Sequence, residues 1–115
     1  MSEHAILVVE DDFIQRRQIT RVLLETGYTV FGASEGLEAI GLLDEQKIHL
    51  VLTDIRMPCL DGISLLKYIK IFYPLVPVVI ATGYPRELEE LKPDELLCKP
   101  FAADGLIACI RRLVQ

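Results

Sequence analysis

The chain has 115 residues, of which 51% are hydrophobic and 25% are charged, with a formal net charge of −5 and an isoelectric point near 5.0. A chain of this length can bury a self-standing core, so we expect residues 1–115 to form one domain. The acidic balance argues against a nucleic-acid partner, because contact with phosphates needs a basic face. No apolar run reaches the length of a membrane span and no signal-like segment is present, so a cytoplasmic protein is expected.

Strand-like and helix-like segments alternate along the chain. Continuous apolar runs of strand length predict five strands, at Ala5–Glu10, Tyr28–Ala33, Ile48–Asp54, Val76–Thr82 and Leu96–Lys99. Helical periodicity predicts helices at Phe13–Thr26, from Ser34 through Leu43, from Asp61 to about Phe72, and at Ala102–Val114. Ser34 and Asp61 are the predicted N-caps, and Gly27 is the predicted stop of the first helix. Pro85–Leu91 has room for only a short fourth helix.

This alternation predicts an α/β protein with a parallel sheet covered by helices on both faces, because the strands are apolar throughout rather than at every second residue. Five βα units with right-handed crossovers suit the flavodoxin-like (βα)5 fold, with strand order 2-1-3-4-5 and a fourth helix that is short or absent. In that order the first and third strands are neighbours. Ligands bind at such a switch point, outside the carboxyl ends of the strands.

Acidic side chains stand at the ends of these two strands. Glu10 and Asp11 follow the first strand and Asp54 ends the third, so the fold predicts that they converge. Carboxylates that lie this close repel one another unless a cation lies among them. Oxygen ligands without a nearby His or Cys select Mg²⁺, or Mn²⁺, over zinc or copper. The sequence therefore predicts a magnesium site.

Two further strand ends carry groups that suit an anion. Thr82 ends the fourth strand with a hydroxyl, and Lys99 ends the fifth with an ammonium on a long stem. Together with the metal they could neutralise an incoming phosphoryl group, while one carboxylate attacks phosphorus to give an aspartyl phosphate. Each group alone has a simpler explanation, such as a helix-dipole partner for Glu10-Asp11-Asp12 or an ordinary turn for Asp54 and Thr82. Their order, each at its own strand end, favours the joint site.

These motifs resemble the receiver domain of bacterial two-component response regulators. The resemblance lies in Ile6-Leu7-Val8-Val9-Glu10-Asp11-Asp12, Asp54-Ile55-Arg56-Met57-Pro58 with Asp61-Gly62, Ala81-Thr82-Gly83 and Lys99-Pro100-Phe101. It implies that Asp54 accepts phosphate from a kinase phosphohistidine, and that Thr82 and Lys99 contact the phosphoryl group. It also implies that Mg²⁺ is held by Glu10, Asp11, Asp54 and the backbone carbonyl of Arg56. The Lys99–Pro100 peptide is expected to be cis.

The chain departs from the family pattern in the region between Thr82 and Lys99. Receivers usually have Tyr or Phe three residues before the lysine, where this chain has Leu96. Only 17 positions separate Thr82 from Lys99 (99 − 82), about a helical turn or more fewer than is usual. The run Pro77–Tyr84 resembles the "FATGUY" receiver subgroup, which lacks a regular fourth helix. We therefore hypothesise that Tyr84 gates the site in place of the missing aromatic residue.

The resemblance implies a stand-alone response regulator that acts as a phospho-acceptor. Its expected partners are a histidine kinase or histidine phosphotransfer protein and an unknown downstream protein, with the chain itself a monomer or weak dimer. Two alternatives remain open. An aspartate-nucleophile phosphatase is disfavoured because Arg56 stands where an acid/base carboxylate is commonly needed. A pseudo-receiver, folded but never phosphorylated, is disfavoured by the intact set of acids.

Overall fold

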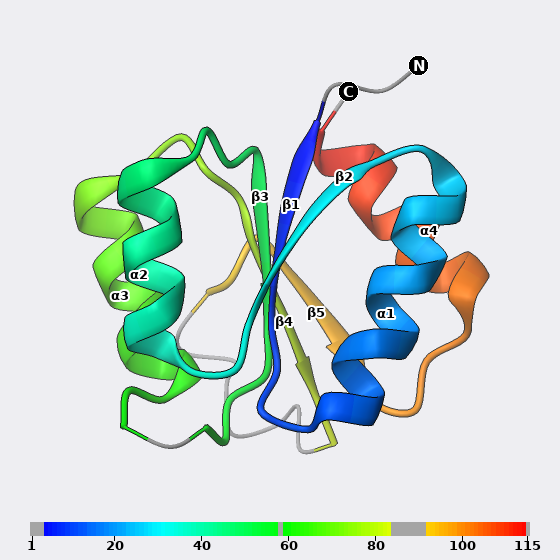
Figure 1. Cartoon of the computed structure of the whole chain (residues 1–115), viewed down its shortest axis with the longest axis horizontal. Coiled ribbons are helices and arrows are strands. Elements are labelled where there is room, and N and C mark those ends of the chain that lie inside the picture. Colours follow the sequence, from blue (N-terminus) through cyan, green and yellow to red (C-terminus); the bar gives the residue numbers. More distant parts are fainter. Residues whose placement is uncertain (1–3, 58, 84–91, 115) are drawn as a thin grey trace.

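The computed structural model describes residues 4–57, 59–83 and 92–114. These residues form a parallel five-stranded sheet between two layers of helices (Figure 1). The strand order is β2-β1-β3-β4-β5, which confirms the predicted topology. The strands are β1 (Ala5–Val9), β2 (Thr29–Ala33), β3 (Leu50–Thr53), β4 (Val78–Thr82) and β5 (Glu95–Cys98). The helices are α1 (Phe13–Thr26), α2 (Gly36–Glu45), α3 (Gly62–Phe72) and α4 (Ala103–Leu113).

The three central strands are buried along their whole length, which explains why their sequences are continuously apolar. Successive side chains point to opposite faces of the sheet. In β1, Leu7 and Val9 join the hydrophobic cluster under α2 and α3, whereas Ile6 and Val8 join the cluster under α1 and α4. The two helix layers therefore cover two separate halves of one core, as Figure 1 shows.

The ends of α1 and α3 follow the predicted local chemistry. The Asp61 carboxylate accepts a hydrogen bond from the N–H of Ser64 at 2.8 Å and caps α3. Gly27 ends α1 with a φ of 105°, a left-handed conformation that glycine adopts without strain. Both residues were predicted to mark these ends. None of the helices in the described ranges is long and apolar enough to cross a membrane.

The predicted N-cap of α2 was wrong by one residue. Glu35, rather than Ser34, caps this helix, and its carboxylate accepts a hydrogen bond from the N–H of Glu38 at 2.6 Å. In return, the Glu38 carboxylate accepts a hydrogen bond from the N–H of Ser34 at 3.1 Å. The longer side chain of Glu35 thus forms the capping hydrogen bond that was expected of the Ser34 hydroxyl. The helix also continues to Glu45 instead of ending at Leu43.

Two element boundaries near the carboxyl end differ by one residue from the predicted ones. Strand β5 ends at Cys98, one residue before the predicted Lys99, and α4 begins at Ala103 with Ala102 as a cap that makes no side-chain hydrogen bond. The short fourth helix predicted at Pro85–Leu91 lies outside the described residues. In Figure 1 the label α4 therefore denotes the last helix of the chain.

Candidate functional site

The sheet itself brings the predicted site residues to one edge. Backbone hydrogen bonds continue the ladder just past the assigned strands: the N–H of Glu10 donates to the Ala33 carbonyl at 3.0 Å, and the N–H of Asp54 donates to the Val9 carbonyl at 3.1 Å. On the other side of the sheet, the N–H of Lys99 donates to the Thr82 carbonyl at 2.7 Å. These bonds fix the main chain of the site residues to rigid strands.

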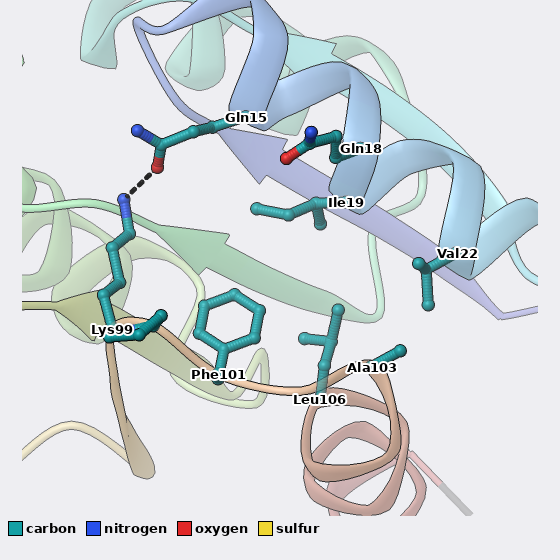
Figure 2. Close-up of a pocket in the computed structure, with 9 residues that line it drawn as sticks. Gln15, Gln18, Ile19, Val22, Lys99, Phe101, Ala103 and Leu106 are labelled. Carbon is teal, nitrogen blue, oxygen red and sulfur yellow. Dashed lines mark hydrogen bonds between the residues drawn. The ribbon is translucent and has the colours of Figure 1, made fainter.

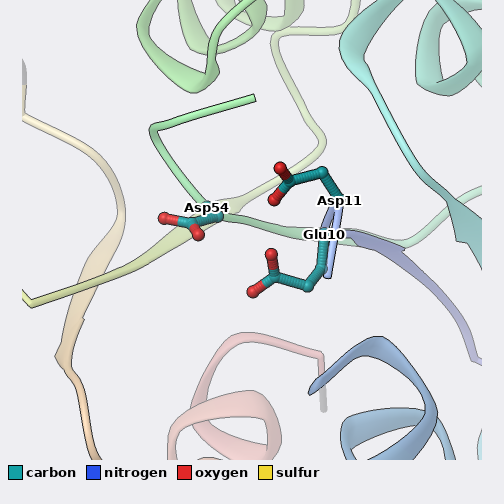
Figure 3. Close-up of side chains that lie close together, drawn as sticks. All are labelled: Glu10, Asp11 and Asp54. Atoms are coloured by element: carbon teal, nitrogen blue, oxygen red, sulfur yellow. The ribbon is translucent and has the colours of Figure 1, made fainter. Parts of the chain in front are cut away.

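Three carboxylates converge at this edge, as the sequence predicted. Glu10, Asp11 and Asp54 each offer an oxygen, and these oxygens lie within 4.8 Å of one another (Figure 3). Glu10 is buried, with 3% of its surface exposed, while Asp54 is partly buried and Asp11 is exposed. The cluster therefore opens to solvent on the side of Asp11 and is closed on the side of Glu10.

Short contacts orient two of these carboxylates. One oxygen of Glu10 accepts a hydrogen bond from the N–H of Asp12 at 3.2 Å. The Oδ1 atom of Asp54 accepts one from the N–H of Ile55 at 2.7 Å. Each acid is thus held through one oxygen by the main chain that follows it, and the other oxygen of each accepts a hydrogen bond from Lys99.

The Lys99 ammonium contacts two of the acids from the end of β5, the strand at one edge of the sheet. Its Nζ atom lies 2.7 Å from Oε1 of Glu10 and 3.2 Å from Oδ2 of Asp54. A third contact, of 2.8 Å, joins Nζ to the side-chain oxygen of Gln15 on α1. An ammonium has three N–H donors, so these three acceptors use them all.

The pKa shifts of Glu10 and Lys99 reflect both their burial and the contacts between their charges. Burial raises the pKa of Glu10, and the charge of Asp54 adds to this, although Lys99 and the N–H of Asp12 offset part of the rise. Burial alone would lower the pKa of Lys99, but its contacts with Glu10 and Asp54 outweigh burial and raise it. The ammonium therefore stays charged, while a buried acid remains costly to ionise.

A hard divalent cation suits this arrangement. The donor set consists of carboxylate oxygens, the ligands that Mg²⁺ prefers, and its open side leaves space for the waters that Mg²⁺ keeps. A cation would also remove the repulsion between Asp54 and Glu10 that contributes to the raised pKa of Glu10. Receiver domains bind Mg²⁺ at an acidic pocket of this kind, and the residues present fit that ion.

The other predicted residues lie where the strand ends place them. Thr82 is buried at the end of β4, and Arg56 is exposed in the loop after β3. The Lys99–Pro100 peptide is cis, which confirms that prediction. Leu96 pairs with Ile80 across the sheet and packs on the cluster under α2 and α3. Tyr84 lies outside the described residues, so its gating role stays a prediction.

The structure adds residues that the sequence analysis did not assign to the site. Gln15 contacts Lys99, and Arg16 donates a hydrogen bond to the Glu10 carbonyl at 2.6 Å. Both belong to the first turn of α1, which starts at the carboxyl end of β1. Their position in the sequence could have indicated this, because the first turn of a helix that follows a site strand faces the same edge of the sheet.

A cavity of about 460 Å³ lies next to the acid cluster, between α1 and the segment that leads from β5 into α4 (Figure 2). Its walls are largely apolar and include Ile19, Val22, Phe101 and Leu106. Gln15 and Lys99 lie at the end of this row of side chains, with their hydrogen bond between them. Lys99 therefore lines the cavity and also contacts two acids of the cluster, Glu10 and Asp54.

Comparison with known proteins identifies the family. The sequence model of the response regulator receiver domain family matches residues 6–111 of this chain. The chain is 31% identical to sporulation initiation phosphotransferase F of Bacillus subtilis, over 97% of this chain and 94% of that protein. It is 39% identical to the transcriptional regulatory protein ZraR of Escherichia coli, over 93% of this chain but only 25% of that protein. The chain thus spans about a quarter of the length of that regulator.

Solved structures agree with this assignment. The receiver domain of the Francisella response regulator 1452 superposes with a TM-score of 0.89 at 31% identity, covering 97% of both chains. The response regulator TrrA of Thermotoga maritima, solved in complex with Mg(2+)-BeF, gives a TM-score of 0.88 at 28% identity, covering 96% of this chain and 98% of that one. Receiver domains accept phosphoryl groups in two-component signalling. The fold, the acid cluster and the family match all agree, and the chain belongs to the family of response regulator receiver domains.

Proposed function

We propose that Asp54 is the phosphoryl acceptor of this receiver domain and that the transfer depends on Mg²⁺ held by Glu10, Asp11 and Asp54. The observation that carries the proposal is the convergence of three carboxylates within 4.8 Å, one of which, Asp54, also lies 3.2 Å from the Lys99 ammonium. A structural neighbour solved with Mg(2+)-BeF supports the same chemistry. The Arg56 carbonyl, two residues beyond Asp54, is proposed as a further ligand.

The proposed donor is a phosphohistidine of a histidine kinase or of a histidine phosphotransfer protein. A carboxylate oxygen of Asp54 attacks phosphorus, and a P–O bond forms as the P–N bond breaks. The electron pair of that bond stays on the imidazole nitrogen, which leaves as neutral imidazole when the other ring nitrogen carries a proton. The bound Mg²⁺ supplies charge neutralisation for the phosphoryl oxygens.

The chain's own groups act on the phosphoryl oxygens. Lys99 donates hydrogen bonds from an ammonium that is already aimed at Asp54, and the Thr82 hydroxyl donates from the adjoining strand end. Phosphorylation adds a charge of about −1.5 to −2 at neutral pH. This charge competes with Glu10 for Lys99, so it provides a physical cause for a change of conformation.

We further propose that the chain works as a stand-alone response regulator, signalling through protein contacts in trans or by relay to another histidine. The similarity to the Bacillus subtilis phosphotransferase supports this, because it extends over 94% of that protein's length. A monomer or weak dimer, with a single domain across residues 1–115, is the state in which we expect it to act.

Intact-protein mass spectrometry with acetyl phosphate as a small-molecule donor tests the acceptor assignment. The wild type should gain one phosphoryl group in the presence of Mg²⁺ and none in EDTA, and Asp54→Asn should gain none. Asp61→Asn is a matched control, because it removes an exposed carboxylate of the same loop while keeping a side chain that caps α3. Phosphorylation of Asp54→Asn at the wild-type rate, or of the wild type without Mg²⁺, would contradict the proposal.

A further inference from the structure

Gln15 joins an anion to a cation through the two ends of its side-chain amide. Its oxygen accepts a hydrogen bond from the Lys99 ammonium at 2.8 Å (Figure 2). Its nitrogen donates one to Oδ2 of Asp12 at 3.3 Å. Because one end faces a positive charge and the other a negative charge, the amide fits in this orientation and not in the flipped one.

Asp12 is itself held rigidly, so it can orient Gln15. The Oδ1 atom of Asp12 accepts hydrogen bonds from the N–H groups of Ile14 at 2.9 Å and of Gln15 at 3.1 Å, which makes Asp12 the N-cap of α1. Because Oδ1 accepts both of these N–H groups, the other oxygen of Asp12, Oδ2, is left to accept the hydrogen bond from the Gln15 side chain. The capped end of α1 is thus a fixed support for the Gln15 amide.

The three acceptors of Lys99 differ in one respect. Glu10 and Asp54 belong to the cluster of carboxylates that fits a divalent cation, whereas Gln15 stands outside it. When those two acids engage a cation, their attraction for the ammonium weakens. The Gln15 oxygen then remains as an acceptor that is neutral and does not compete for the cation.

We propose that Gln15 is a positioning residue, which holds the Lys99 ammonium beside Asp54 when the acids are occupied by a cation, so that the ammonium meets the incoming phosphoryl group. The inference rests on the proposed role of Asp54 as acceptor. It gives Gln15 a role in the rate of phosphorylation without contact with the metal. Neither Leu nor Glu can replace it: Leu lacks the acceptor, and the carboxylate of Glu would face Asp12 and bind Lys99 too strongly.

The chain offers a closely matched control. Gln18 lies on the same helix, is exposed, and lines the same cavity, but no hydrogen bond joins it to Lys99 in the described structure. With acetyl phosphate and saturating Mg²⁺, Gln15→Leu should slow phosphorylation by roughly tenfold or more, the worth of a hydrogen bond to a charged group. Gln18→Leu should react at the wild-type rate, and Gln15→Glu should also be slow.

A double-mutant cycle separates positioning from a general effect on α1. In a Lys99→Ala background, Gln15→Leu should cause no further loss of rate, because the group that it positions is gone. Mg²⁺ affinity and thermal stability should stay close to wild type in Gln15→Leu. In the metal-bound protein, the ¹⁵N signal of the Lys99 ammonium should broaden through faster hydrogen exchange in Gln15→Leu and not in Gln18→Leu.

The outcomes distinguish this inference from the proposed function. Wild-type phosphorylation on Asp54 combined with an undiminished rate in Gln15→Leu would overturn the role of Gln15 alone. An equal loss of rate in the wild-type and Lys99→Ala backgrounds would do the same, because it would show an effect that does not pass through Lys99. A wild type that takes no phosphoryl group on Asp54 would overturn both.

Discussion

Gly62 packs against the main chain of Asp54 too closely for any side chain to fit between them. A Cβ atom added to Gly62 would lie 2.1 Å from the Asp54 carbonyl oxygen and 2.8 Å from Cα of Ile55. The N–H of Gly62 also donates a hydrogen bond to the Ile55 carbonyl at 2.8 Å. The start of α3 therefore braces the loop that carries the candidate acceptor, and glycine is needed there for space rather than for a left-handed conformation.

Substitution of Gly62 should accordingly destabilise the protein. We expect Gly62→Ala to lower the free energy of unfolding by roughly 1–3 kcal/mol, the usual cost of overpacking, because the clash is with backbone atoms that cannot rotate away. Gly41→Ala is the matched control, because a Cβ atom added there, in the interior of α2, meets nothing within 4 Å. This variant should have a free energy of unfolding roughly 0.5–1 kcal/mol higher than that of the wild type. Urea unfolding followed by circular dichroism measures both, and a Gly62→Ala variant as stable as wild type would refute the bracing role.

Removal of the Lys99 charge should strengthen Mg²⁺ binding while it weakens phosphorylation. In Lys99→Met the ammonium no longer neutralises Glu10 and Asp54, so the acids attract a cation more strongly, by about fivefold for a partly screened charge. The same variant should accept phosphate more slowly, since the phosphoryl oxygens lose a donor. Isothermal titration with Mg²⁺ gives the affinity, and Lys67→Met, which removes an exposed charge on α3, should leave it unchanged. Weaker Mg²⁺ binding in Lys99→Met would contradict this account.

His49 should make the protein less stable as the pH falls below about 6.5. Burial lowers the pKa of His49, and the nearby charges of His4 and Lys47 lower it further. Its neutral Nδ1 atom accepts a hydrogen bond from the N–H of Ala5 at 2.9 Å, which protonation would break. The unfolded chain therefore binds the proton more tightly, so the contribution is fully present above the unfolded pKa and is lost as the pH falls through the folded one.

The variant His49→Asn isolates this contribution, because the Asn oxygen can accept the same hydrogen bond and does not titrate. The difference in unfolding free energy between wild type and His49→Asn should shift by up to about 1 kcal/mol between pH 7.5 and pH 5, in favour of the variant at the lower pH. Urea unfolding at the two pH values measures it. A difference that is constant with pH would show that His49 does not carry the effect.

The sheet order and the meeting of the acids could be predicted because they depend on few features of the sequence. Continuous apolar runs mark strands buried on both faces, and the polar residue at which each run stops lies at one edge of a parallel sheet. Glu10 and Asp54 could thus be placed together from the ends of their strands alone. The roles of these residues in phosphoryl transfer remain a proposal.

The remaining features depend on three-dimensional detail that the sequence pattern does not contain. A glutamine in an amphipathic helix is ordinarily a solvent-facing residue, and only the rotation of α1 against the sheet directs Gln15 toward Lys99. Gly62 has no positive φ to mark it, so its tight fit appears only when α3 is docked on the loop. The exchange of Ser34 for Glu35 as the cap of α2 depends on which side chain reaches Glu38.

Parallel strands give this domain two opposite rims: β1 begins and α4 ends at one rim, whereas β1 and β3 end at the other, which carries the acid cluster (Figure 1). A strand of five residues spans roughly 17 Å. A further module fused before His4 or after Val114 would consequently start remote from Asp54, the proposed phosphoryl acceptor. Such a module would respond to phosphorylation there through long-range allosteric coupling across the sheet or its helices, whereas a free-standing partner could dock directly at the rim that carries the proposed acceptor.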